Sequence, residues 1–295
     1  AQSKMNKKEY KSCRIPFPPI ETQHHIVTKV DELMALCDQL EQQQTGSNAA
    51  HQTLVEALLD TLTTAADQNE FTEAWERIAN HFDTLFTTEQ SIDQLKRTIL
   101  QLAFTGRLCE NSKEQLKYAD IFKSISEERK IFHDERNVRL QKFEPLQLNF
   151  DEPEIPDNWC FVYLNDVIVF VTDFQANGSF ATLRKNVQYF KTENYAILVR
   201  LKDLRHNLTR EEDFVYTDKH GYDFLSKSFL KGGEIVVANV GAGVGTTLEI
   251  PSINRPATLA PNMFMVVISK HIDKEYFKYF CQSPFYWKYI KKVGT

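Results

Sequence analysis

The sequence of 295 residues lacks the features that mark a membrane or secreted protein. No apolar run approaches the roughly 20 residues that a bilayer-spanning helix needs, and the N-terminal residues lack the apolar core of a signal peptide. The five cysteines are scattered, without a Cys-x-x-Cys pair or a Cys/His cluster, so neither a disulfide framework nor a zinc site is indicated. We therefore expect a cytoplasmic protein without a metal site.

Motifs of several enzyme classes are also missing. There is no Walker loop, no His-Glu-x-x-His and no Gly-x-Ser-x-Gly, and the Asn/Asp-Pro-Pro-aromatic signature of adenine methyltransferases is absent. The glycine-rich segment GAGVG at 241–245 precedes TTLEIP, which is typical of a strand rather than of the helix that a dinucleotide-binding loop requires. The sequence thus predicts a tight turn between strands at 241–245, and none of these motifs indicates a catalytic site.

Charge is divided unevenly along the chain, although the net charge is only -5. Residues 1–159 contain 18 Lys and Arg against 27 Asp and Glu, whereas residues 160–295 contain 17 against 13. A basic C-terminal part favours contact with nucleic acid, and ordinary variation along a soluble chain is the alternative.

The first part of the sequence has helical periodicity. Between residues 21 and 44 the apolar positions step by four and three residues, which is the seam of a coiled coil, and these positions are Ile26, Val30, Leu33, Cys37 and Leu40. This helix would be about 36 Å long, close to the ~34 Å of one DNA turn. Further helices are predicted around 54–62, 75–85 and 92–102, with polar breaks at 45–48 and 67–70 and a C-terminal cap at Gly106.

The second part has a different pattern. Residues 107–149 are highly charged and predict a solvated connector, with a helical stretch at 116–125. Beyond 152–159, short β-branched runs alternate with Gly, Asn, Asp and Pro, which is typical of strands. We therefore predict an α+β chain, in which a long helical coiled-coil-type spacer precedes a mixed, mostly β domain with two short C-terminal helices.

Several segments resemble the specificity (S) subunits of Type I restriction-modification systems. IPFPPIETQHHIVTKVDELMALCDQLE (15–41) and the stretch at 76–108 are similar to the central conserved region of that family. PEIPDNW (153–159), GGEIVVANVGAGVGTT (232–247) and the segment at 275–295 resemble the opening, an internal strand and turn, and the closing helices of its target recognition domains. The similarity covers nearly the whole chain.

The resemblance implies a domain organisation. Residues 1–20 would be the tail of a preceding recognition domain or a linker, 21–110 the helical conserved spacer, 111–150 a charged connector, and 151–295 the second target recognition domain, which binds DNA. Family members usually carry two recognition domains. We therefore expect a fragment of a longer chain or, alternatively, a half-subunit that pairs as a homodimer.

The resemblance also implies a function. The chain would read one half of a bipartite double-stranded DNA target, and its helices would dock methyltransferase (M) subunits, which bring in the motor-nuclease (R) subunit. S-adenosylmethionine, ATP and Mg would belong to those partners, with no cofactor bound by this chain. The seam of residues 26–40 would pair with a second conserved helix, while Trp75 and Phe82 would contact either the core or a partner. The alternatives are a fragment of an adenine DNA methyltransferase and a coiled-coil adaptor that does not bind DNA.

Reading DNA requires cations for phosphates, and amide or guanidinium groups for base edges. Both kinds of residue occur in the basic part. We expect base contacts from Gln175, Arg184, Asn186, Arg200 and Asn239, and phosphate contacts from Lys185, Lys202, Arg205, Lys227 and Lys231. Thr246 flanks the glycine turn on the side opposite Asn239 and joins this set. For each of these residues, a solvated surface position is the alternative.

Overall fold

The structure is a computed structural model that describes residues 19–108, 118–140, 142–146, 150, 152–241 and 243–294. It divides into two compact units between Ile92 and Asp93. Helices and two β-sheets are both present, which confirms the predicted α+β class. Among the described residues no helix is long and apolar enough to cross a membrane.

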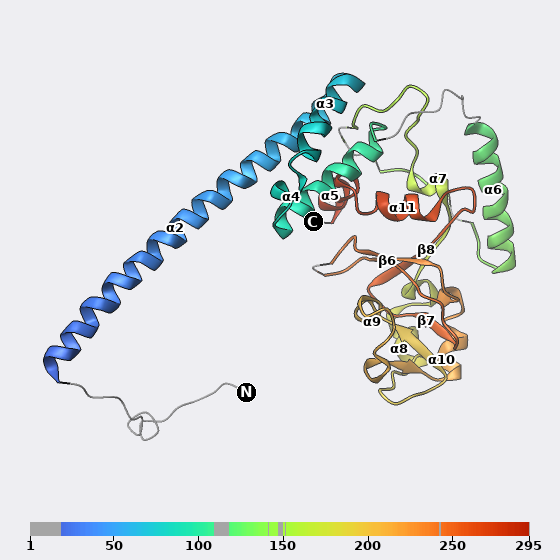
Figure 1. The fold of residues 1–295 in the computed structure, drawn as a ribbon. Coiled ribbons are helices and arrows are strands. Elements are labelled where there is room, and N and C mark those ends of the chain that lie inside the picture. Colours follow the sequence, from blue (N-terminus) through green and yellow to red (C-terminus); the bar gives the residue numbers. More distant parts are fainter. Residues whose placement is uncertain are drawn as a thin grey trace. The chain divides into compact units, whose positions relative to one another are not determined.

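The first unit is dominated by one long helix, α2, which spans Ile20–Thr64 (Figure 1). Its 45 residues correspond to about 68 Å. The predicted break at 45–48 is wrong, because the helix continues through Gly46 without interruption. A single glycine costs a helix only about 1 kcal/mol, which the cooperative hydrogen bonding of a 45-residue helix offsets. The expected length of one DNA turn is therefore also wrong, since α2 is about twice as long.

The C-terminal part of α2 packs against α3 (Gln68–Ala79). The buried side chains come from both helices and from α4 (Phe82–Leu85), and they are Val55, Leu59, Leu62, Ala74, Ile78 and Leu85. Asp67 ends the connection by accepting hydrogen bonds from the backbone nitrogens of Asn69 and Glu70, at 2.8 and 2.9 Å. The predicted break at 67–70 is thus confirmed, and its cause is an N-terminal cap.

Helix α5 (Glu89–Phe104) ends in the cap predicted at Gly106. Gly106 has a φ of 72°, its backbone nitrogen donates to the Ala103 carbonyl, and that of Arg107 donates to the Leu102 carbonyl. Glycine suits this position because it adopts a positive φ without strain. The ring of Phe104 then contacts Tyr276 and Phe280 of α11 (Lys274–Phe280), at centroid distances of 5.2 and 5.5 Å.

The second unit contains two four-stranded sheets. In the first, the order is β1 (Ile168–Asp173), β8 (Met263–Ile268), β5 (Ile235–Ala238) and β6 (Thr247–Glu249), and every pair is antiparallel. In the second, the order is β3 (Tyr216–Thr217), β2 (Ala196–Val199), β7 (Ala257–Leu259) and β4 (Phe229–Leu230). Here β2 and β7 are parallel and the other pairs antiparallel.

One hydrophobic core joins the two sheets. It contains Val236 and Met265 from the first sheet and Val199 and Leu259 from the second. The opposite face of β5 contributes Ile235 and Val237 to a separate cluster with α11 and α12 (Pro284–Val293). The four residues of β5 are therefore buried on both faces, which explains the uninterrupted apolar run IVVA. The two predicted C-terminal helices are confirmed.

Helix α6 (Tyr118–Glu135) packs on β1, although it lies in the segment predicted as a solvated connector. Ile125 is buried, and Arg129 donates hydrogen bonds to the carbonyls of Ile168 and Asn165. Glu128 accepts a hydrogen bond from the hydroxyl of Ser269 at 2.5 Å. The charges of this helix thus cap the end of the sheet at which β1 begins and β8 ends, which the sequence pattern does not reveal.

Short helices connect the strands of the second unit. They are α7 (Leu164–Val167), η1 (Phe174–Asn177), α8 (Phe180–Asn186), α9 (Leu201–Arg205), η2 (Glu211–Asp213), α10 (Lys219–Phe224) and η3 (Ser226–Ser228). Several of them begin directly after a strand ends, so their side chains gather at strand ends. The candidate site is built from these connections.

Candidate nucleic-acid interface

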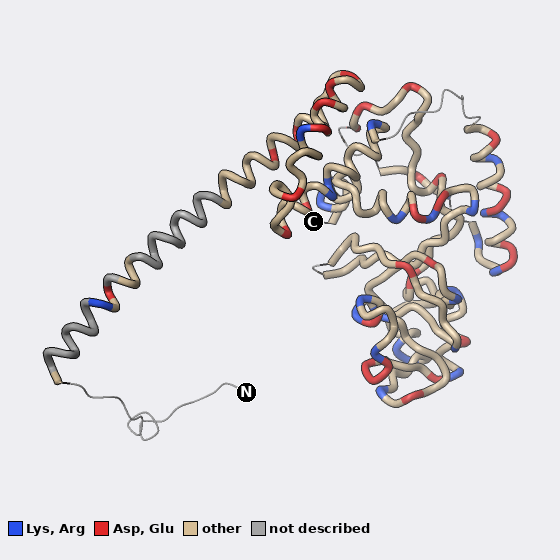
Figure 2. Tube along the Cα trace, viewed as in Figure 1, with Lys and Arg blue, Asp and Glu red and all other residues tan. Residues whose placement is uncertain are grey.

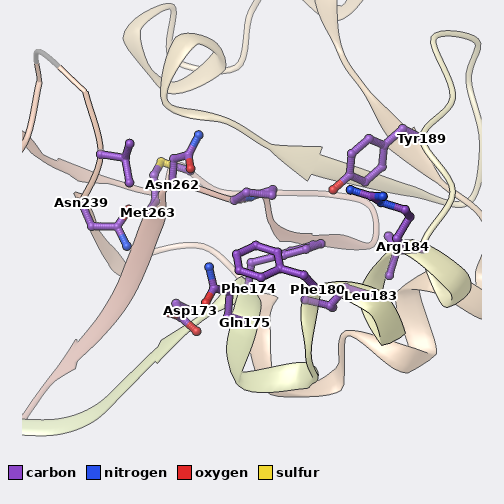
Figure 3. A pocket seen from close by; sticks show the side chains of 13 residues that line it. Asp173, Phe174, Gln175, Phe180, Leu183, Arg184, Tyr189, Asn239, Asn262 and Met263 are labelled. Atoms are coloured by element: carbon purple, nitrogen blue, oxygen red, sulfur yellow. The ribbon is translucent and has the colours of Figure 1, made fainter.

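A cavity of about 530 Å³ opens where β1 and β5 end and β8 begins. Its walls come from η1 and α8, from the chain at Val187 and Tyr189, from the turn after β5, and from residues 261–263 (Figure 3). In this view Arg184 and Tyr189 lie at one end, and Asn239 lies at the other. The cavity therefore places a cation and amides around one hollow.

A second cavity of about 500 Å³ adjoins the first. The two share five lining residues, Tyr189, Val240, Pro261, Asn262 and Met263. Arg200 and Lys202 line only the second cavity. Together the two cavities form one groove, which we call the polar groove.

Local hydrogen bonds fix the α8 side of the groove. The carboxylate of Asp173 accepts from the backbone nitrogen of Ala176 at 2.7 Å, which starts η1 as β1 ends. The Ser179 hydroxyl accepts from the backbone nitrogen of Thr182 at 3.3 Å and caps α8. Leu183 is buried against the core, so the opposite face of this short helix is directed toward solvent.

The glycine-rich turn forms the opposite side, and it is the strand-to-strand turn that the sequence predicts. The nitrogen of Gly245 donates to the Ala238 carbonyl at 2.8 Å, and β6 follows directly. Gly245 has a φ of 87°, and a Cβ atom there would lie 2.6 Å from Cγ2 of Ile290. The Tyr286 hydroxyl donates to the Gly245 carbonyl at 2.9 Å. Helix α12 thus holds the turn in position.

The structure brings together three of the residues predicted to read bases. Gln175, Arg184 and Asn239 line the first cavity, and all three are exposed. Within the described parts of the chain, no side-chain hydrogen bond or ion pair is found for any of them. Their polar groups are therefore available to a ligand. Asn262, which is not among the residues predicted to contact DNA, lines both cavities and is exposed as well.

Arg200 has partners within the fold. Its guanidinium donates to both carboxylate oxygens of Asp203, at 2.9 and 2.7 Å, and to the Asp213 carbonyl at 2.6 Å. These hydrogen bonds to Asp203 raise the pKa of Arg200. Lys202 pairs with the Asp213 carboxylate at 3.0 Å, and this contact lowers the pKa of Asp213. Both cations hold α9 against η2, so base or phosphate contact by either stays a prediction.

The remaining predicted residues lie apart from the cavity linings. Asn186 donates to the Thr182 carbonyl at 2.8 Å, and the ammonium of Lys227 donates to the Ala176 carbonyl at 3.0 Å. Lys231 precedes β5, whereas Asn239 follows it, so these two lie beyond opposite ends of the strand. Lys185 is exposed in the last turn of α8, beside Arg184. Thr246 ends the glycine turn, where its backbone nitrogen donates to the Gly243 carbonyl. Arg205 lies beside the same turn, since its Nη2 would be 3.3 Å from a Cβ atom placed on Gly243.

Three apolar residues of the groove were missed from the sequence. Phe180 is 72% exposed, Val240 is 59% exposed and Tyr189 is 57% exposed, and all three line the first cavity. A phenylalanine or valine in a β-rich sequence usually belongs to the core. Sequence alone gives no signal that these side chains are exposed.

The seam residues of α2 are only partly described. Val30 and Leu33 are exposed, and so is Met34, which follows Leu33 directly. The side chains of Ile26, Cys37 and Leu40 lie outside the described residues. In α3 and α4, Trp75 and Phe82 are 40% and 43% exposed. These helices therefore carry apolar side chains on their surface.

The fold and the polar groove define a class: an α+β domain, preceded in sequence by a helical unit, with a groove lined by amides, charged groups of both signs and apolar side chains. No known family profile matches the chain. The specificity subunit of the Type I restriction enzyme EcoAI from Escherichia coli is 34% identical over 242 residues, which are 82% of this chain and 39% of that protein. The EcoEI specificity subunit, also from Escherichia coli, is 40% identical over 168 residues, which are 57% of this chain and 28% of that protein.

Both relatives are Type I restriction enzyme specificity subunits, and the similarity to them extends over most of this chain. The resemblance stated from the sequence motifs is thereby confirmed. The chain spans less than half the length of both curated relatives, so the activity and partners of a whole subunit are matters of proposal.

Proposed function

We propose that this chain acts as a specificity subunit of a Type I restriction-modification complex. It reads one half of a bipartite DNA target through its second unit, and its helices dock the methyltransferase subunits. The chain performs no bond chemistry itself. S-adenosylmethionine, ATP and Mg are bound by the partner subunits. The relatives named above support this assignment, since both are specificity subunits.

The observation that carries the proposal is the polar groove. Amides and a guanidinium line one cavity without partners in the described structure, and these groups match the hydrogen-bonding edges of bases in the major groove. Arg184 is suited to O6 and N7 of guanine, and Gln175 and Asn239 are suited to adenine. Lys185 and Arg205 are both exposed, and we expect them to contact phosphates.

The long helix supports a spacer role. Val30, Leu33 and Met34 expose apolar side chains along α2, and an antiparallel helix packed on them would bury this seam. Such a pair would set the distance between two recognition domains, and so the gap in a bipartite target. At about 68 Å, α2 corresponds to roughly two turns of DNA.

Fluorescence anisotropy with labelled duplex DNA tests the proposal. We expect the affinity for DNA to fall steeply between about 50 and 200 mM salt, because the protein releases condensed counterions from DNA when it contacts phosphates. The double variant Arg184→Ala/Lys185→Ala should bind DNA more weakly. Its plot of the logarithm of the binding constant against the logarithm of the salt concentration should have a slope that is shallower by about 1–2.

A matched control removes the same charges elsewhere. Arg139 and Lys130 are both exposed, line neither cavity and take part in no ion pair with a described residue. The variant Arg139→Ala/Lys130→Ala should keep the affinity and the salt slope of the unmodified chain. Duplex affinity that is indifferent to salt, or an equal loss in both double variants, would contradict DNA reading by the polar groove.

A further inference from the structure

Apolar side chains surround the first cavity together with its polar groups. Phe180, Val240 and Tyr189 are more than half exposed, and all three line this one cavity (Figure 3). Single exposed apolar residues are ordinary on a protein surface. Several around one hollow mark a binding surface, because they are buried when a ligand docks.

Phe180 is held in its exposed position by the fold. It is the first residue of α8, directly after the Ser179 cap. The inward face of the helix carries Leu183, which packs with Phe174 and Leu225 in a buried cluster. Arg184 follows Phe180 by four residues, so the two side chains share one face of the helix. A ligand that fills the first cavity can therefore contact both side chains, because both line it.

Duplex DNA offers one apolar group in its major groove, which is the C5 methyl of thymine. The partner of that thymine is adenine, whose N6 and N7 match an Asn or Gln amide. Gln175 and Asn239 line the same cavity as Phe180 and expose their side chains. An apolar contact and an amide in one site are the combination that an A·T pair requires.

We propose that Phe180 reads the C5 methyl of a thymine in the target, beside an adenine that the amide of Gln175 or Asn239 reads. This inference rests on the proposed function and adds an A·T pair to what the polar groove recognises. It also assigns a specificity-determining role to an aromatic residue that has neither charge nor hydrogen-bonding groups.

Selection from a random-sequence duplex pool, with the full 295-residue chain as the binder, provides the probe. Each thymine of the selected duplex is then replaced in turn by deoxyuridine, which removes the methyl and leaves base pairing unchanged. We expect one position at which deoxyuridine weakens binding about four-fold, as the loss of one buried methyl group predicts. The variant Phe180→Ala should bind the thymine duplex and the deoxyuridine duplex with equal affinity.

Phe161→Ala is the matched control, because Phe161 is also exposed but lines neither cavity. It should keep the four-fold preference. The inference is overturned if no uridine replacement weakens binding by the unmodified chain, or if Phe180→Ala retains the preference. A chain that binds no duplex in a salt-dependent manner overturns the proposed function instead, so the two failures are distinguishable.

Discussion

Replacing Gly245 by alanine should destabilise the second unit through two separate effects. The φ of 87° places an L-residue in the left-handed region, at a cost of about 1–2 kcal/mol. The new Cβ atom would also lie 2.6 Å from Cγ2 of Ile290, and overpacking of this kind costs about 1–3 kcal/mol. We therefore expect a total loss of about 2–5 kcal/mol, a large share of the ~5–15 kcal/mol stability of a typical domain.

A second glycine in the same turn separates the two effects. Gly241 has a φ of 89°, but a Cβ atom there would meet nothing within 4 Å. Gly241→Ala should therefore lose only the backbone part, about 1–2 kcal/mol. Urea unfolding followed by tryptophan fluorescence, with Trp287 of α12 as the nearby probe, measures the difference. Equal losses for the two variants would refute the steric argument. So would a Gly245→Ala change that costs as much in an Ile290→Ala background as in the unmodified chain.

Three further predictions follow from buried polar groups. Arg200→Ala should lower the free energy of unfolding in urea by about 2–4 kcal/mol, because the carboxylate of Asp203, which is 1% exposed, loses its guanidinium partner. The double variant Arg200→Ala/Asp203→Ala should lose less than the sum of the two single variants. Burial raises the pKa of Cys281 to about 11, so peptide mapping after alkylation at pH 8 should find exposed Cys160 modified well before Cys281. Burial raises the pKa of Tyr286 from 10.0 to about 12, so the folded state favours the neutral phenol. The contribution of this shift to the free energy of unfolding should be fully present below pH 10 and lost as the pH rises to about 12, by up to about 2.7 kcal/mol. Tyr286→Phe should remove this pH-dependent loss.

Signals that act over a few residues were readable in the sequence. The break before α3 and the end of α5 were predicted, because Asp67 and Gly106 satisfy the backbone within one helical turn. The β-rich character of the second unit was predicted from short apolar runs such as IVVA at 235–238. The continuity of α2 was not, because the hydrogen bonds of a long helix act cooperatively and outweigh the local cost of Gly46.

Features that depend on distant parts of the chain were not readable. Glu128 and Arg129 looked solvated in a charged segment, yet their partners are 141 and 39 residues away. For the candidate site, residue type predicted Gln175, Arg184 and Asn239, which line the first cavity, and equally Lys227 and Lys231, which line neither cavity. It could not identify Phe180, because burial of an aromatic side chain is decided by the tertiary fold.

The electrostatics of the polar groove depend on which cations have an anionic partner, and not on net charge. Residues 160–295 carry a net charge of +4, and Figure 2 shows Lys and Arg interspersed with Asp and Glu over the described parts of this unit. Arg200 and Lys202 are paired with Asp203 and Asp213, so little of their charge acts on an approaching polyanion. Arg184 is in no ion pair with a described residue. The carboxylate of Asp173 also lines the first cavity, beside Gln175, whereas Arg184 lies at the other end in Figure 3. A phosphate backbone should therefore be drawn to the Arg184 end of the groove, because attraction is strongest for a cation that is not paired with an anion.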